Sequence, residues 1–391
     1  MIKCVKCNEV DAIAKAGIVR GKQRYHCEHC DYYFTLPLVD AAAEKTPTRK
    51  HQTTIIDIAR TLQVSKSTVS RALRGHADIN PQTRQAILEL AKELDYQPNL
   101  LAYGLAKNVS LTIGIIVPEF INSFFPYVII GAQEIANPRG YHILICQSNE
   151  SHAIEIENTK VLMASRVDGI LASLTGETPD VEHFRKFEKA GIPVVYFNRV
   201  CDNVNASKVI VDDYEGAFKG VEHLIENGCS KIAHIAGPPN LMISKNRLQG
   251  YVNALKKHNL TVDESLIVRT NLTTKSATDC ARHLFSMADR PDAVFCLNDP
   301  AAISAMLVAK ELKIKIPDDV AFVGFSDEPA AALMEPGLTT LAQPTNEIGK
   351  TAIGLLFDQM NASRETFEHV TKILQTKLIV RKSSLHGVTK I

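Results

Sequence analysis

The sequence Val64-Ser65-Lys66-Ser67-Thr68-Val69-Ser70-Arg71-Ala72-Leu73 decides the fold of the N-terminal part of the chain. Ser65 follows a short turn, and a serine hydroxyl in that place accepts a hydrogen bond from the first free N–H groups of a helix. The apolar residues after it recur at helical spacing, so we predict a helix from Lys66 to Leu73 with those residues facing inward. The residues left facing outward are Lys66, Ser67, Ser70 and Arg71.

Two further helices are predicted on either side of this one. Thr54 and Asp57 form a capping-box start signal for a helix over residues 55–62. Asn80 caps a third helix and Pro81 occupies its first position, where the missing N–H of proline costs no helical hydrogen bond. Three short helices joined by a tight turn make a helix-turn-helix module, which we assign to residues 53–98.

Two CxxC pairs precede this module, Cys4 with Cys7 and Cys27 with Cys30. Each pair can turn two thiolates toward one point, and together they complete the tetrahedral shell that structural zinc prefers. A segment this short cannot fold on its own apolar core, so metal binding is expected to supply much of its folding free energy. We therefore predict a zinc ribbon with one structural Zn²⁺ ion at residues 1–36, and a linker at residues 37–52.

Residues 21–35 of this segment resemble the small zinc ribbons at the front of transposases. One interpretation is a second nucleic-acid contact through Lys22, Arg24, Tyr32 and Tyr33. The other is a solvated basic hairpin that contacts a protein or persists from a domain fusion.

Charge is divided unevenly along the 391 residues, although the net charge is only +1. The first 109 residues carry 16 Lys and Arg against 11 Asp and Glu, and the remainder carries 28 against 32. This asymmetry suits a polyanionic partner at one end. No apolar run reaches the ~18 residues of a membrane span and no secretory leader is seen, so we expect a cytoplasmic protein without a membrane partner.

From residue 111 onward, apolar runs rich in Val and Ile alternate with amphipathic stretches. The runs are residues 112–118, 141–148, 167–173, 192–198, 231–237, 292–298 and 320–325. Such alternation is typical of buried parallel strands covered by helices. About ten strands exceed one ordinary sheet, so we predict a two-lobed α/β domain with parallel sheets at residues 110–391. Ligands of such folds lie beyond the carboxyl ends of the strands.

Residues 54–105 resemble the headpiece of the LacI family of transcription regulators, on the motifs above and on Tyr96-Gln97-Pro98-Asn99. The resemblance implies that the second helix enters the major groove of DNA, with Lys66, Ser67 and Arg71 reading bases. Thr68, Ser70 and Asn80 would bind phosphates. The remaining implied DNA contacts are Thr54, Ser65, Tyr96 and Asn99.

The family also has a hinge that becomes helical only on operator DNA and inserts a leucine into the minor groove. By resemblance, residues 99–109 form this hinge, with Leu105 as the wedge and Ala102 as the close-packing residue. Tyr103 departs from the family, which often carries a basic residue there.

Three later motifs resemble the effector domain of the same family, whose fold is that of periplasmic sugar-binding proteins. They are Asn122-Ser123-Phe124-Phe125, Arg247-Leu248-Gln249-Gly250-Tyr251 and Gly324-Phe325-Ser326-Asp327-Glu328-Pro329. Carried over by position, Phe124 and Phe125 would stack on a ligand. Hydrogen bonds to it would come from Asn198, Arg247, Asn298 and Asp299. Ser326 stands where the family commonly has an acidic residue. Asp327 either substitutes for that residue or caps a turn.

These features together predict a DNA-binding transcription regulator, expected to be a repressor, that binds a pseudo-palindromic operator as a homodimer. A sugar or sugar derivative between the lobes is the expected effector, with a nucleobase as the alternative. The alternatives are a zinc-ribbon accessory protein of a mobile element and a cytoplasmic α/β enzyme. We predict no catalytic residues, because the sequence has no GxxxxGK[ST], GxSxG or HExxH motif and no GxGxxG after a strand. His152, His183 and the other late histidines have no metal spacing and are assigned no ligand role.

Overall fold

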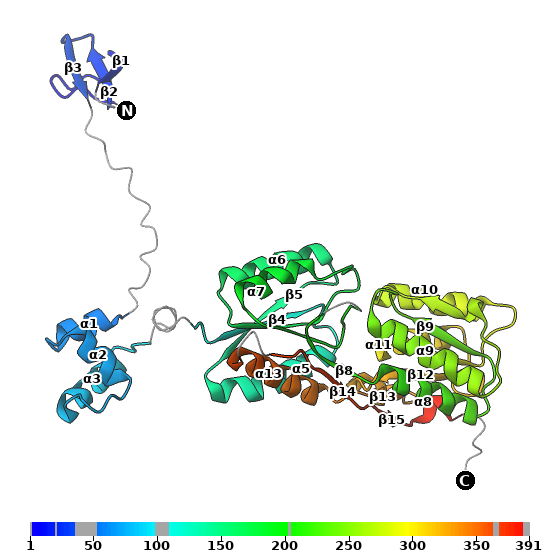
Figure 1. Ribbon diagram of the computed structural model, residues 1–391. Helices are drawn as coiled ribbons and strands as arrows, with labels where there is room; N and C mark the ends of the chain where they lie inside the picture. The colour runs from blue at the N-terminus through cyan, green and yellow to red at the C-terminus, as the bar shows by residue number, and fades with distance from the viewer. Residues whose placement is uncertain are drawn as a thin grey trace. The chain divides into compact units, whose positions relative to one another are not determined.

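The computed structural model describes residues 2–19, 22–35, 53–97, 109–201, 205–362 and 367–385. It divides into two units, Met1–Asn99 and Leu100–Ile391, which are described separately (Figure 1). The predicted linker and almost all of the predicted hinge lie outside the described residues. Asn99, Ala102 and Leu105 of the predicted hinge therefore lie outside the described residues.

The first unit begins with a small antiparallel sheet of β1 (Ile13–Val19), β2 (Lys22–Cys27) and β3 (Tyr32–Thr35), in that order. Its core consists of Cys4, Cys27 and Phe34. So few buried side chains cannot stabilise a fold by apolar burial alone.

Three helices follow in the same unit, α1 (Ile55–Thr61), α2 (Lys66–Leu73) and α3 (Pro81–Glu93). The predicted caps are present. Asp57 Oδ2 accepts from the N–H of Thr54 at 2.9 Å, Ser65 Oγ from that of Thr68 at 3.0 Å, and Asn80 Oδ1 from that of Gln82 at 2.9 Å. The inward faces of the helices form one core from Ile58, Ala59, Val69, Ala72, Ile87 and Ala91.

The second unit contains two six-stranded sheets, one in each lobe. The first lobe has the order β14-β8-β7-β6-β4-β5, from β4 (Thr112–Val117), β5 (His142–Gln147), β6 (Gly169–Ala172), β7 (Val194–Phe197), β8 (Ser207–Val211) and β14 (Thr371–Leu374). The second has the order β10-β9-β11-β12-β13-β15, from β9 (Ile232–Ala236), β10 (Ile267–Arg269), β11 (Ala293–Cys296), β12 (Ala321–Ser326), β13 (Thr339–Ala342) and β15 (Lys377–Ile379). All pairs are parallel except β13 with β15.

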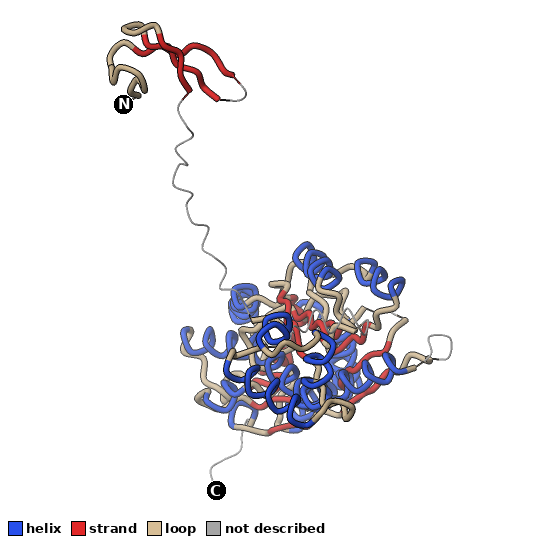
Figure 2. The backbone as a smooth tube through the Cα atoms, turned by 90° about the vertical axis from the view of Figure 1, so that its left-hand side faces the viewer, coloured by secondary structure: helices blue, strands red, loops and turns tan. Residues whose placement is uncertain are grey.

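Helices cover these sheets, as Figure 2 shows for the strands in red and the helices in blue. The first lobe carries α5 (Phe124–Ala136), η1 (Asn137–Arg139), α6 (His152–Ala164), η2 (Glu182–Phe184), α7 (Arg185–Ala190) and α13 (Thr345–Asn361). The second carries α8 (Asp213–Glu226), α9 (Met242–Lys257), η3 (Glu264–Leu266), α10 (Thr274–Ser286), α11 (Asp299–Glu311), α12 (Pro329–Leu333) and η4 (Lys382–Ser384). The predicted two-lobed α/β fold with parallel sheets is confirmed.

The chain passes between the lobes three times. It leaves the first lobe after β8, returns after β13 and crosses again between β14 and β15. Each lobe is therefore assembled from separate segments of the sequence.

A close helix crossing fixes α5 in the first lobe. A Cβ atom added at Gly349 of α13 would lie 2.8 Å from the backbone nitrogen of Ala132 and closer still to the carbonyl oxygen of Val128. Only glycine permits this approach. Since α5 begins at Phe124, the crossing also determines where the predicted ligand-stacking residues lie.

No helix among the described residues combines the length and apolar character that crossing a membrane requires.

Candidate functional site

The exposed surface of α2 presents the predicted base-reading side chains. Lys66 and Ser67 are exposed in its first turn and Arg71 in its last. Arg71 Nη2 lies 2.5 Å from Asp78 Oδ2, in the turn before α3. This pair restricts the guanidinium to one side of the helix, and it leaves other N–H groups of the fork available for a base or phosphate.

Several of the other residues predicted to contact DNA also stabilise the headpiece. The side chains of Ser65 and Asn80 cap α2 and α3. Thr54 Oγ1 donates to Asp57 Oδ2 at 2.7 Å. Tyr96 packs against the headpiece core, and burial raises the pKa of its hydroxyl. Thr68 and Ser70 are half-buried.

The four N-terminal cysteines converge. The Sγ atoms of Cys4 and Cys30 are 3.7 Å apart, those of Cys7 and Cys27 are 3.6 Å apart, and all four lie within 4.8 Å of one another. The backbone N–H of Lys6 points at Cys4 Sγ at 3.4 Å. Four thiolates in this arrangement fit a tetrahedral Zn²⁺ ion, with no position left for a substrate.

Two aromatic rings of the same small sheet carry cationic neighbours. Tyr33 stacks on His26 with the ring centroids 4.2 Å apart, and the Arg24 guanidinium lies 4.4 Å from the Tyr33 centroid. Lys6 Nζ is 5.5 Å from the Tyr32 centroid. The side chain of Lys22 lies outside what the structure describes.

A cavity of about 450 Å³, its open mouth included, lies between the two lobes of the second unit. The first lobe contributes Glu119, Asn122, Phe124, Phe125, Asn198 and Arg199. The second contributes Ile243, Arg247, Leu272, Leu297, Asn298, Pro300, Ser326, Glu328 and Gln343. Most of these residues follow the carboxyl end of a strand, which is where the sequence predicted the ligand.

Arg247 is the most strongly positioned cation of this cavity. Its Nε and Nη2 donate to Asp213 Oδ1 at 2.8 and 2.7 Å, and its Nη1 donates to the carbonyl of Leu297. The guanidinium carbon lies 3.6 Å from the centroid of the Phe325 ring. Burial opposes both charges and raises the pKa of Asp213 despite its partner. A guanidinium has five N–H donors, so two remain for a ligand.

Apolar and amide groups complete the predicted set. Phe124 and Phe125 pack edge to face, with centroids 5.1 Å apart, and both line the cavity although they are largely buried. Asn198 lines it in a left-handed conformation with φ 57°. Asn298 also lines it, while its Oδ1 caps α11 by accepting from the N–H of Ala301 at 3.0 Å.

Asp299 and Asp327 differ from the prediction, because neither lines the cavity. Asp299 is fully buried behind it and accepts from Thr340 Oγ1 at 2.5 Å and from the N–H of Glu328 at 2.8 Å. Burial raises the pKa of Asp299 to about 7. Asp327 is paired with Arg381 at 2.7 Å. Asp299 and Asp327 therefore stabilise the loop that follows β12.

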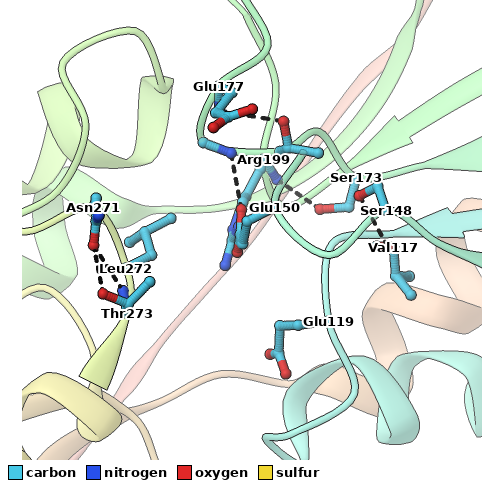
Figure 3. A network of polar contacts seen from close by, with 12 residues as sticks. Val117, Glu119, Ser148, Glu150, Ser173, Glu177, Arg199, Asn271, Leu272 and Thr273 are labelled. Carbon is cyan, nitrogen blue, oxygen red and sulfur yellow. Dashed lines mark hydrogen bonds and ion pairs between the residues drawn. The ribbon is translucent and has the colours of Figure 1, made fainter. Parts of the chain in front are cut away.

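Sequence reasoning missed several cavity residues, above all the charged ones. Arg199 donates through Nη1 to Glu150 Oε1 at 2.6 Å, and its backbone N–H donates to Ser173 Oγ at 3.4 Å (Figure 3). Arg199 directly follows the predicted Asn198, so its position after a strand was an available signal. Glu119 lies two residues beyond β4 and could have been found in the same way.

Glu328 joins the two lobes. Its Oε2 accepts from the backbone N–H of Ser123 at 2.9 Å and from Ser123 Oγ at 2.5 Å. Asn240 of the second lobe makes a further link, because its Nδ2 donates to the carbonyls of Gly176 and Thr178, each at 3.0 Å. A change in the angle between the lobes must break or remake these bonds.

Comparison with known sequences agrees with both units. Residues 54–99 match the pattern of bacterial regulatory proteins of the lacI family, and residues 221–384 match the periplasmic binding protein-like domain. The transcriptional repressor CytR of Escherichia coli K12 is 32% identical over 334 residues, which are 85% of this chain and 96% of that protein. The repressor PurR of Vibrio atlanticus is 30% identical over 329 residues, 83% of this chain and 98% of its own. These names favour a regulator over an enzyme.

Two solved structures agree with the fold. A complex of the transcriptional regulator CelR with cellobiose is 30% identical, with a TM-score of 0.65, and covers 85% of this chain and 99% of its own. The lac repressor dimer bound to operator and the anti-inducer ONPF has a TM-score of 0.75 over the same shares at 24% identity. The chain belongs to the LacI family of bacterial regulatory proteins, and it is a DNA-binding transcription regulator controlled by a small-molecule effector.

Proposed function

We propose that the effector is a sugar or sugar derivative that binds in the cavity between the lobes and changes the affinity for operator DNA. One observation carries this proposal. Arg247 is held by Asp213 and the Leu297 carbonyl, its two other N–H groups bond to none of the described residues, and it lines the same cavity as Phe124 and Phe125. An apolar face with a few directed donors suits a ring that bears hydroxyl groups.

The acidic groups of the cavity add to this argument. Ser326 supplies only a hydroxyl, and that hydroxyl accepts from Gln343 Nε2 at 3.0 Å. Glu119 and Glu328 line the cavity instead, and carboxylates accept hydrogen bonds from sugar hydroxyls. The CelR structure, at 30% identity, holds cellobiose, which supports the same class of ligand.

Control of DNA binding requires that the ligand prefer one arrangement of the lobes. The bonds of Ser123 to Glu328 and of Asn240 to the loop at residues 176–178 are made in the arrangement described here. A ligand that touches both lobes changes the free energy of this arrangement relative to others. Operator DNA then changes ligand affinity by the factor by which the ligand changes DNA affinity.

The effector proposal is tested by a thermal-shift screen of sugars, sugar acids and nucleosides, followed by calorimetry on each hit. Arg247→Lys keeps a positive charge beside Asp213 but loses the planar fork, so the affinity is expected to fall at least ~tenfold. Arg282→Lys is the matched control, since Arg282 lies on the exposed side of α10. A hit whose affinity is indifferent to both Arg247→Lys and Phe124→Ala would place the ligand elsewhere.

We also propose that a homodimer reads a pseudo-palindromic operator through Lys66, Ser67 and Arg71, with the hinge at residues 99–109 in the minor groove. Exposure of these three side chains on α2 supports the first part. Site selection followed by footprinting should return an inverted repeat with a pyrimidine–purine step at its centre. Recovery of one asymmetric half-site would contradict the dimeric arrangement.

The third proposal is that Cys4, Cys7, Cys27 and Cys30 bind one structural Zn²⁺ ion per chain. The convergence of the four Sγ atoms supports it. Elemental analysis should find this ion, and Cys4→Ser with Cys7→Ser should remove it. Deleting residues 1–36 then separates the two roles considered for the ribbon, because a DNA contact would lower operator affinity and reduce its salt dependence.

A further inference from the structure

A second group of metal-binding side chains lies in the first lobe, outside the residues that line the effector cavity. His152 and Glu155 are three residues apart on α6, so they share one face of the helix. His183 lies in η2 and reaches the same point, although the sequence separates it by some thirty residues. Ligand atoms of these three residues all lie within 4.8 Å of one another. Neither histidine was predicted from the sequence to be a ligand, because only the fold brings the two together.

The carboxylate of this group is buried between two half-buried histidines, and one imidazole nitrogen has no hydrogen-bond partner among the described residues. Glu155 is fully buried, and the side chain of His183 is 6% exposed. His183 Nε2 lies 2.8 Å from Glu155 Oε1, and the two histidine rings meet at 71° with centroids 5.1 Å apart. His152 Nε2 is buried and finds no hydrogen-bond partner among the described residues. A buried nitrogen without a partner is costly, and a bound cation would satisfy it.

The carboxylate is held as the carboxylates of metal sites are. Glu155 Oε2 accepts from the backbone N–H of Thr175 at 3.0 Å, and Oε1 accepts from Thr178 Oγ1 at 2.9 Å. Such outer hydrogen bonds orient a ligand and fix its rotamer before the metal arrives. Neither bond has to break for Oε1 to coordinate an ion.

We propose that His152, Glu155 and His183 bind a divalent transition-metal ion, with Zn²⁺ as the reference ion. Two imidazoles and one carboxylate are borderline donors that suit zinc and its neighbours, and three protein ligands leave a position for water. Ligand atoms around zinc lie about 3.3 Å apart at bond lengths of about 2.0 to 2.1 Å. The His183–Glu155 pair therefore has to open slightly and His152 has to move closer. His183 gives up any proton that it shares with Glu155.

The metal site would act on the contact between the lobes. Thr175 and Thr178, which orient Glu155, flank the carbonyl of Gly176 that Asn240 binds from the second lobe. The N–H of Gly176 donates to Glu150 Oε2 at 2.9 Å, and Glu150 pairs with Arg199 of the cavity. An ion on Glu155 thus stiffens the loop on which the second lobe closes.

The test measures zinc binding by the full chain, in competition with a chromophoric chelator. His152→Gln is the decisive variant, because His152 Nε2 has no hydrogen bond to any described residue that the substitution could break. It is expected to weaken one zinc site at least ~tenfold and to leave the melting temperature without metal unchanged. His183→Gln is the second variant, since its amide can still donate to Glu155. The matched control is His142→Gln, an exposed histidine of the same lobe, which should bind as the wild type does.

Zinc bound by the four cysteines is distinguished from zinc bound at His152 by a cysteine variant and by the absorption spectrum of the cobalt-substituted protein. Cys4→Ser with Cys7→Ser should leave the ion on His152 in place. Cobalt substituted there should lack the sulfur-to-metal charge-transfer band that thiolate ligands produce. The proposal is overturned if no bound zinc is sensitive to His152→Gln or His183→Gln, whatever the ribbon binds.

Discussion

The pH dependence of stability is expected to change when His234 is replaced by phenylalanine. His234 lies on β9 and is fully buried, stacked against the rings of Tyr251 and Phe295 at centroid distances of 5.1 and 5.0 Å. Burial lowers the pKa of His234 to about 4 from an ordinary value of 6.5, and the nearby cations Arg269 and Arg247 act in the same direction. The hydrogen bond between Nδ1 and the Phe295 carbonyl opposes them.

The size of the effect follows from this pKa shift. Between pH 6.5 and pH 4 the unfolded chain holds a proton on His234 that the folded chain lacks, so acid favours unfolding. Each pH unit in this window changes the free energy of unfolding by about 1.4 kcal/mol, and the whole window changes it by about 3 kcal/mol. His234→Phe keeps the aromatic stack and removes the titration. The stability of the wild type relative to the variant should therefore fall by about 3 kcal/mol from pH 6.5 to pH 4.

The assay is calorimetric or urea unfolding of both proteins across this pH range. Only the difference between them is informative, because Asp299 works in the opposite direction. Its pKa of about 7 means that the folded chain keeps a proton which the unfolded chain has lost above its ordinary pKa of 3.8, so stability falls as the pH rises toward 7. His142→Phe serves as an exposed control. Parallel pH curves for wild type and His234→Phe would refute the reasoning.

Further substitutions test three other parts of the molecule. Gly349→Ala should destabilise the protein by ~1 to 3 kcal/mol through its clash with α5, whereas Gly354→Ala on the same helix meets open space and should stabilise it by ~0.5 to 1 kcal/mol; equal melting temperatures would contradict the crossing. Arg71→Ala should weaken operator binding by ~1 to 3 kcal/mol in fluorescence anisotropy at fixed salt, and Asp78→Ala, which removes only the ion pair, should weaken it less. Glu328→Ala should weaken effector binding at least ~tenfold, since it breaks the bonds to Ser123 across the cavity; an unchanged dissociation constant would rule out closure through that contact.

Caps and apolar spacing in the sequence predicted those helices and strands whose bounds depend on residues close together in the chain. The helix predicted from Lys66 to Leu73 has those bounds in the structure, because the Ser65 cap and the apolar spacing act within a few residues. The run predicted at residues 112–118 is β4 (Thr112–Val117), since a strand buried on both faces is apolar throughout. The short strands β14 and β15 went unnoticed, because half-exposed edge strands of three or four residues carry no periodic pattern.

The residues of the candidate site that were predicted are those that a family motif or the end of a predicted strand marked. Phe124, Arg247 and Asn298 were found through their resemblance to a family and do line the cavity. Glu328 lies within a motif that resembles the family. Its bond to Ser123 joins residues more than two hundred positions apart, and no local pattern predicts that these two side chains are in contact. The proximity of His152 and His183 was not predicted for the same reason, since it depends on where η2 packs against α6.

The three crossings between the lobes have a consequence for folding during synthesis. The first lobe begins with β4, yet its sheet is complete only when β14 has been made, and α5 lacks its largest packing partner until α13 emerges. Until then the newly made half-lobe exposes the apolar faces of α5 and its sheet, which is the condition in which chains aggregate or recruit chaperones. The helix-turn-helix, by contrast, contains its whole core within residues 55–96 and can fold while the ribosome is still far from the last strands. A stalled or truncated chain would therefore carry a folded helix-turn-helix without the two lobes of the second unit.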